Sequence, residues 1–163
     1  MNVLAGDIGG TKTVLAVFAA TDSGLVLEAE QVYPSREYAG LEDIVGEFLA
    51  ARAMAVDAAA FGIAGPVDGR TARTTNLPWT VDADLLERAR GIPRVRLLND
   101  LEATAYGIYE LPAEDLQELV PGQAAPGANA GVIAAGTGLG EAGIYREGGL
   151  PRPFAAEGGH GRF

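Results

Sequence analysis

Apolar and polar positions along the chain follow the two periods expected of strands and helices. β-branched apolar runs, separated by a Gly-rich turn and by Asp22-Ser23-Gly24, predict a three-stranded antiparallel meander over residues 2–32. Apolar residues at helical spacing predict a helix over Leu41–Met54. A second helix is predicted over Val81–Arg90, with Asp82 as its candidate N-cap. The other elements predicted here are strands at Val56–Ile63 and Arg94–Leu98 and a helix at Leu101–Tyr109.

A proline- and glycine-rich stretch, residues 112–129, is the predicted linker. After it, strands at Gly131–Ala135 and Leu139–Tyr145 flank a turn with Gly and Thr, which repeats the pattern of the chain's opening. We therefore expect a first lobe at 1–111 and the beginning of a second lobe at 130–163. A lobe of about 35 residues cannot bury a core unaided, so we expect a fragment or a chain that something else completes.

Charge and composition exclude several classes of function. The chain has 163 residues, no Cys, one His and 22 acidic against 12 basic side chains, for a formal net charge of −10. This charge argues against DNA, RNA or an anionic membrane as the main partner. Without cysteine there is no disulfide framework and no thiolate metal site. There is no apolar run of about 18 residues, and Asp7 lies where a signal peptide would be apolar, so we expect a cytoplasmic protein.

The first glycine-rich turn, GDIGGTKT, has the composition of a phosphate site. It misses a Walker A loop by one residue, because Thr11 stands where the second Gly would be, and a strand follows it rather than a helix. Between two antiparallel strands, its backbone N–H groups and the Thr11 hydroxyl can approach a phosphate, and Asp7 can hold Mg²⁺ through water. The alternative is an ordinary hairpin with a solvated Asp7 and a solvated Lys12, the only lysine.

A second turn, Gly136-Thr137-Gly138-Leu139-Gly140, resembles the first. It departs from the dinucleotide fingerprint, because its glycines follow GxGxG and a strand comes next. A simple tight turn is the alternative for this segment. Together, however, the two strand–turn–strand units are what a two-sided phosphate clamp needs.

Polar residues at the ends of predicted strands are candidates for substrate contacts. Asn99 can cap the helix that follows, with Glu102 completing a capping box, while Asp100 accepts a proton from a substrate hydroxyl. The loop Glu157–His160 contains the only His and suits a polyhydroxylated ligand, although a lone His also serves structural hydrogen bonds. In Thr75–Trp79 an aromatic edge beside an amide suits a sugar, and a packed Trp turn is the alternative.

The order of these motifs resembles the N-terminal half of the bacterial glucokinases over essentially the whole chain. The resemblance implies an α/β fold of the actin-like ATPase/hexokinase (ribonuclease H-like) type, with the first lobe and the beginning of the second. The matching motifs are DIGGTKT at Asp7–Thr13, GIAGPVDG at Gly62–Gly69, TNLPW at Thr75–Trp79, LLNDLEATAYG at Leu97–Gly107, AAGTGLGEA at Ala134–Ala142 and EGGH at Glu157–His160.

The resemblance also implies roles for individual residues. Asp100 matches the general base for the sugar 6-hydroxyl, and Asp7 lies on the metal side. The implied function is an ATP:D-glucose 6-phosphotransferase at the entry to glycolysis, with ATP and Mg²⁺ as cofactors, glucose and MgATP as partners, and a homodimer left open. The implied sugar contacts are Asn76, Asn99, Asp100, Glu157 and His160. The implied phosphate contacts are Gly6, Asp7, Ile8, Gly9, Gly10, Thr11, Lys12, Gly136, Thr137 and Gly138.

Two alternatives stay open within this fold. EGGH and Asn-Leu-Pro-Trp also resemble the repressor/kinase family of sugar kinases, which implies another hexose specificity. A non-catalytic sugar-binding or regulatory protein is the second alternative. Gly161–Phe163 departs from the acidic residue that the resemblance implies there. Since members of the resembled family are about twice as long, we expect little or no kinase activity from residues 1–163 alone.

Overall fold

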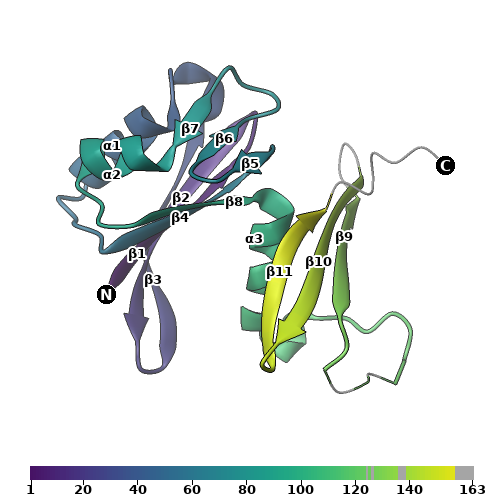
Figure 1. The fold of residues 1–163 in the computed structure, drawn as a ribbon. Helices are drawn as coiled ribbons and strands as arrows, with labels where there is room; N and C mark the ends of the chain where they lie inside the picture. The colour runs from purple at the N-terminus through teal and green to yellow at the C-terminus, as the bar shows by residue number, and fades with distance from the viewer. Residues whose placement is uncertain (124, 126, 136–138, 157–163) are drawn as a thin grey trace. The chain divides into compact units, whose positions relative to one another are not determined.

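The computed structural model describes residues 1–123, 125, 127–135 and 139–156. It divides into two compact units, Met1–Asp100 and Leu101–Phe163 (Figure 1). The second unit begins at Leu101, within the helix that follows Asn99 and eleven residues before the predicted linker at 112–129. The lobe boundary within 112–129 stays a prediction.

The first unit is built on a five-stranded sheet of order β3-β2-β1-β4-β8 (Figure 1). Its antiparallel part is the predicted meander, and its parallel part joins β4 and β8 to β1. Ile8, Ile63 and Asn99 are in register, so the carboxyl ends of the three parallel strands meet at one edge of the sheet. The strands are β1 (Asn2–Ile8), β2 (Lys12–Thr21), β3 (Gly24–Pro34), β4 (Ala58–Ile63) and β8 (Val95–Asn99).

Two helices, α1 (Leu41–Ala50) and α2 (Ala83–Arg90), pack against one face of this sheet. They bury alternate strand residues because successive side chains of a strand point to opposite faces. The resulting apolar cluster is the core of the unit. Its large members are Leu4, Ile8, Leu15, Val17, Tyr33, Leu41, Ile44, Phe48, Phe61, Ile63, Trp79, Leu86 and Leu97.

Both helices are shorter than predicted. The first ends at Ala50 rather than Met54, since the chain turns there and Ala53 adopts a φ of 47°, which no right-handed helix contains. The second begins at Ala83, because Val81 belongs to a strand. The Asp82 carboxylate accepts hydrogen bonds from the backbone N–H groups of Asp84 (2.8 Å) and Leu85 (3.1 Å), which confirms the predicted N-cap.

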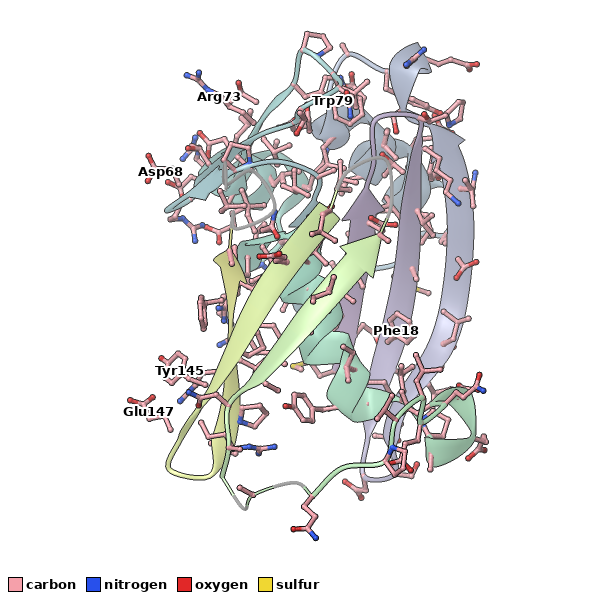
Figure 2. The ribbon with its side chains drawn as sticks, turned by 90° about the vertical axis from the view of Figure 1, so that its right-hand side faces the viewer. Phe18, Asp68, Arg73, Trp79, Tyr145 and Glu147 are labelled. Atoms are coloured by element: carbon pink, nitrogen blue, oxygen red, sulfur yellow. The ribbon has the colours of Figure 1, made fainter. Side chains whose placement is uncertain are left out.

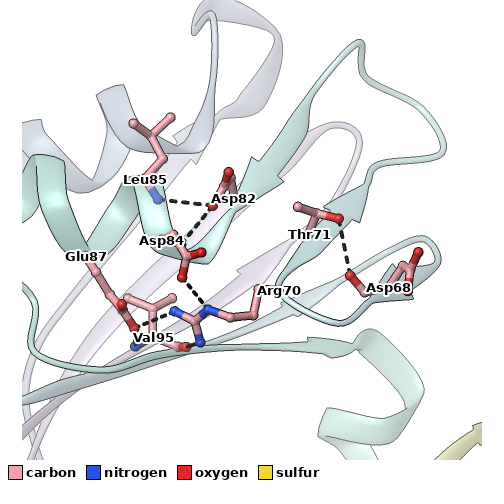
Figure 3. A network of polar contacts seen from close by, with 8 residues as sticks. All are labelled: Asp68, Arg70, Thr71, Asp82, Asp84, Leu85, Glu87 and Val95. Carbon is pink, nitrogen blue, oxygen red and sulfur yellow. Dashed lines mark hydrogen bonds and ion pairs between the residues drawn. The ribbon is translucent and has the colours of Figure 1, made fainter.

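A small antiparallel sheet between β4 and α2 was absent from the sequence-based prediction. It comprises β5 (Val67–Asp68), β6 (Thr71–Arg73) and β7 (Thr80–Asp82). Arg70, in the turn between β5 and β6, donates to the carboxylates of Asp84 and Glu87 and to the Val95 carbonyl (Figure 3). This network ties the small sheet to α2 and to β8.

The second unit packs one helix on a three-stranded sheet. Helix α3 spans Asp100–Gly107 and places Ala105 against Ala142 and Ile144. The sheet has the order β11-β10-β9, with β9 (Ala130–Ala135), β10 (Leu139–Glu147) and β11 (Leu150–Ala156). The remaining secondary-structure elements of the described residues are short 3-10 helices. They are η1 (Ser35–Glu37) in the first unit, and η2 (Ile108–Glu110) and η3 (Ala113–Asp115) in the second.

Strand β11 was also missed by the sequence analysis, because Pro151 and Pro153 interrupt its apolar pattern. Proline lacks the N–H that a central strand must donate, so it is confined to edges. β11 is such an edge strand, paired only with β10 among the described residues. Within the described ranges, no helix has the length and apolar content needed to cross a membrane.

Candidate functional site

The candidate site of the first unit lies at the carboxyl edge of the parallel strands. Asp7 is next to last in β1, Asn99 is last in β8, and Asp100 follows it directly. Because β1 and β8 flank β4 in register, the three residues come to the same edge. In open α/β sheets this edge is where ligands bind.

The glycine-rich turn between β1 and β2 has the hairpin geometry predicted for it. A strand, not a helix, follows the turn, so the Walker A reading is excluded by structure as well as by sequence. The Gly9 N–H donates to the Lys12 carbonyl across the turn (3.0 Å). A Cβ atom added to Gly10 would lie 2.5 Å from the Cβ of Asn76. The phosphate-site candidate Gly10 and the sugar-site candidate Asn76 are therefore neighbours.

The loop after β4 connects these candidates to Asn99. The Asn99 amide donates to the Gly65 carbonyl (3.3 Å), and the Thr75 N–H and hydroxyl both donate to the Ala64 carbonyl (3.0 and 2.9 Å). The Ala64 N–H donates in turn to the Ile8 carbonyl at the end of β1 (3.2 Å). The structure thus brings Asn76, Asn99 and the turn after β1 around one short loop. The predicted capping box of Asn99 and Glu102 stays a prediction.

Two residues important to this arrangement were not singled out from the sequence. A Cβ atom on Gly65 would lie 2.0 Å from the Arg73 carbonyl oxygen, so only glycine lets the two backbones approach. Ser35 is fully buried and forms hydrogen bonds to the carbonyls of Gly9 and Thr11 in the glycine-rich turn. Gly65 belongs to the GIAGPVDG motif at Gly62–Gly69, and this motif was the sequence signal that could have identified it. No sequence pattern marked Ser35.

Two carboxylates, those of Asp7 and Asp100, interact electrostatically at this edge. Partial burial and the nearby Asp100 carboxylate raise the pKa of Asp7 above its ordinary value, while Lys12 opposes the shift. Asp7 and Asp100 are therefore close enough to repel each other. A divalent cation near Asp7 would relieve that repulsion, and Mg²⁺ commonly uses one or two carboxylates plus waters and substrate phosphates. The residues present fit such an ion, although the described residues contain no group of three or more metal-ligating side chains.

Other predicted site residues are not placed here. Gly136, Thr137, Gly138, Glu157 and His160 lie outside the described residues. The two strands that flank the second turn are nevertheless antiparallel neighbours, with Leu139 opposite Ala135, as the repeat of the first hairpin requires.

Trp79 does not offer an aromatic edge to a sugar. It is only 4% exposed, and its indole N–H donates to the Tyr38 carbonyl (3.3 Å). Figure 2 shows it within the first unit. Of the two sequence-based alternatives, the packed Trp turn is therefore correct.

Comparisons of the sequence with known proteins identify the family of the chain. The family model "Glucokinase" matches residues 4–163. The glucokinase of Nostoc punctiforme is 42% identical over 163 residues, which cover 99% of this chain and 48% of that protein. The glucokinase of Synechocystis is 41% identical over 175 residues, which cover all of this chain (100%) and 49% of that protein. The chain thus spans about half the length of the curated relatives it matches.

Solved structures show the same correspondence in three dimensions. A glucokinase from an Antarctic psychrotroph superposes with a TM-score of 0.86 at 28% identity, covering 98% of this chain and 51% of that one. A ROK family glucokinase from Streptomyces griseus, solved with glucose and AMPPNP, gives a TM-score of 0.61 at 28% identity over 93% of this chain and 46% of that one. The predicted α/β fold of the actin-like ATPase/hexokinase type is confirmed. Because the family model matches nearly every residue as well, the chain belongs to the Glucokinase family.

Proposed function

We propose that this chain supplies the general base, part of the sugar site and a phosphate turn of an ATP-dependent glucose kinase. The observation that carries the proposal is the placement of Asp100 and the Gly9–Thr11 turn at one edge of a single sheet, in a chain of this family. We infer that glucose binds through Asn76, Asn99, Asp100, Glu157 and His160. The reaction belongs in the cytoplasm at the entry to glycolysis.

In this mechanism the Asp100 carboxylate accepts the proton of the sugar 6-hydroxyl. The sugar oxygen attacks the γ-phosphorus of ATP in line, its new P–O bond forms, and the bond to the leaving ADP breaks. No covalent intermediate with the enzyme is needed. The amide donor of Asn99 is directed to Gly65, which fixes the end of β8 immediately before the base.

The phosphates of ATP would lie against the turn from Gly6 to Lys12 and against Gly136–Gly138. Backbone N–H groups in such turns bind anions, and glycine allows the close approach. Asp7 would hold Mg²⁺ through water, which supplies charge neutralisation for the phosphates when bound. The neighbouring Asp100 carboxylate supports this role, because a cation would offset the repulsion that, together with burial, raises the pKa of Asp7.

The test is the substitution Asp100→Ala in a protein of the relatives' full length that carries this chain. Formation of glucose 6-phosphate is measured with MgATP in a coupled assay, and glucose binding by calorimetry. We expect kcat to fall about a hundred- to ten-thousandfold, the usual contribution of a general base, while glucose still binds. Asp22→Ala, in the exposed β2–β3 turn, is the matched control and should keep its activity.

Each other outcome has a defined meaning. Normal turnover of Asp100→Ala would show that the assigned base is wrong. If the unaltered protein binds glucose without phosphorylating it, the chain is part of a sugar-binding or regulatory protein. Faster phosphorylation of another hexose would assign it a different sugar specificity. Sedimentation of the same protein distinguishes a monomer from a homodimer.

A further inference from the structure

Ser35, a residue outside every phosphate- or sugar-site candidate, is one of two fully buried polar side chains among the described residues; Thr13 is the other. Burying a hydroxyl stabilises a protein only if the hydroxyl is hydrogen-bonded. Ser35 begins η1, directly after β3, and so lies far from the glycine-rich turn in sequence. The partners of its hydroxyl and of its N–H nevertheless belong to that turn or to the strand that follows it, while its carbonyl accepts from the Tyr38 N–H (3.3 Å).

The hydrogen bonds of Ser35 have a defined direction. Its hydroxyl donates to the Gly9 carbonyl (2.9 Å), and its N–H donates to the Thr11 carbonyl (3.1 Å). A serine hydroxyl has a single hydrogen. Its contact with the Thr13 hydroxyl (3.0 Å) must therefore be donated by Thr13. The result is a relay from Thr13 to Ser35 to the Gly9 carbonyl.

This relay fixes the peptide between Gly9 and Gly10. The peptide is trans, so its carbonyl and its N–H point in opposite directions. Because the Gly9 carbonyl points to the buried Ser35 hydroxyl, the Gly10 N–H points away from that hydroxyl. A peptide between two glycines has no Cβ atoms on either side to restrict its rotation. Its orientation therefore depends on contacts with other residues more than the orientation of a peptide between residues that carry side chains.

We propose that Ser35 is a positioning residue that holds the Gly9–Gly10 peptide in the orientation that presents the Gly10 N–H to a nucleotide phosphate. The inference rests on the proposed function, since it assigns the turn to ATP. Without the Ser35 hydroxyl, the Gly9 carbonyl loses its buried donor and the peptide is free to rotate. The turn would then offer a carbonyl oxygen, rather than an N–H, to the phosphate for part of the time.

The experiment compares Ser35→Ala with Thr13→Val in a protein of the relatives' full length. Both substitutions remove one buried hydroxyl, but Thr13→Val leaves the bond from Ser35 to Gly9 intact. For Ser35→Ala we expect KM for MgATP to rise about tenfold, as for one lost hydrogen bond, with KM for glucose unchanged. Both substitutions should lower the melting temperature by similar amounts. Thr13→Val should raise KM for MgATP by less than Ser35→Ala does. Ser35→Cys, which keeps a weak donor of similar size, should lie between the wild type and Ser35→Ala, and it carries the test if Ser35→Ala does not fold.

The inference is overturned if Ser35→Ala keeps the KM for MgATP of the wild type. It is equally overturned if Thr13→Val raises that KM as much, since both effects would then reflect general loss of packing. Failure of the proposed function has a different signature, because the unaltered protein would already form no glucose 6-phosphate.

Discussion

The two units of this chain contain sheets of similar apolar character but bury them to different degrees. In the first unit, side chains from the central sheet, from α1 and α2 and from the small sheet form one large buried cluster. In the second, the buried cluster of the described residues consists of Ala105, Ala142 and Ile144. An apolar strand pattern therefore does not by itself decide how much of a sheet is buried. The layers that pack on each face decide it.

The register of the second sheet explains the difference. Val132, opposite Ala142, lies on the face packed by α3, whereas Ile133 and Glu141 alternate to the other face. On that other face Gly143 lies opposite Phe154, and a Cβ atom on Gly143 would meet the Phe154 ring at 2.2 Å. Figure 2 shows Tyr145 and Glu147 at the end of β10. The large apolar side chains of this face keep much of their surface exposed: Ile133 73%, Leu139 46%, Tyr145 45%, Leu150 61% and Phe154 48%.

The largest effect should come from truncating matched phenylalanines in the two units. Phe61 is fully buried in the first unit, and Phe154 is 48% exposed in the second. We expect Phe61→Ala to lower the free energy of unfolding by about 3–5 kcal/mol, through lost burial and a residual cavity. Phe154→Ala should lower it by about 1 kcal/mol or less. Urea unfolding followed by circular dichroism measures both losses, and Trp79 fluorescence follows the first unit separately.

Trp79 is the only tryptophan and lies in the core of the first unit, so its fluorescence reports that unit. Equal losses from the two substitutions would break the comparison, because they would show the outer face of the second sheet to be as well buried as the core of the first.

A smaller effect should separate two glycines of the units. The Cβ of Gly65→Ala would collide with the Arg73 carbonyl oxygen at 2.0 Å, whereas a Cβ atom on Gly131 would lie 4.0 Å from the Ala142 carbonyl oxygen, an ordinary contact. We expect Gly65→Ala to cost about 1–3 kcal/mol of stability, the usual range for overpacking. The Gly65 carbonyl accepts a hydrogen bond from the side-chain amide of Asn99, a proposed glucose contact. A shift of Gly65 should therefore lower the affinity for glucose as well. Gly131→Ala should change neither quantity, and a loss there equal to that of Gly65→Ala would contradict the steric argument.

The sequence predicted the strand and helix order of the first unit well, because alternating and helical periods are local properties. The meander, the Asp82 cap and the turn that contains Gly9 all follow from residues close together in the chain. The small sheet β5–β7 was missed because its strands are two or three residues long and show no period. β11 was missed because its two prolines imitate a loop.

The candidate site divides in the same way. Asp7, Asn99 and Asp100 were found from their positions at strand ends, and the structure brings these ends to one edge. Their assigned roles stay predictions. Ser35 was out of reach, since its contacts to Gly9 and Thr11 depend on how β3 returns to the turn. Trp79 was ambiguous because burial is a tertiary property.

The smallest effect should come from a surface carboxylate in each unit. Glu87 accepts a hydrogen bond from the Val95 N–H (2.8 Å) and one from Arg70 (2.6 Å), and these hold its pKa below the ordinary value (Figure 3). In the second unit, Glu147 pairs with Arg152 at 3.4 Å, and about half or more of each side chain is exposed to solvent. An exposed ion pair of this kind contributes little to stability.

A carboxylate whose pKa is lower in the folded than in the unfolded chain stabilises the fold above its unfolded pKa. That stabilisation is lost as the pH falls through the folded pKa. We therefore expect Glu87→Gln to lower stability at neutral pH and to differ less from the wild type as the pH falls below about 4, where unfolded Glu begins to protonate. Glu147→Gln should stay close to the wild type throughout. Urea titrations at several pH values measure both. If the loss of unfolding free energy in Glu87→Gln instead grew as the pH fell, the charge of Glu87 would not be what its contacts stabilise. The difference in stability between the two units would then come from the apolar core of the first unit alone.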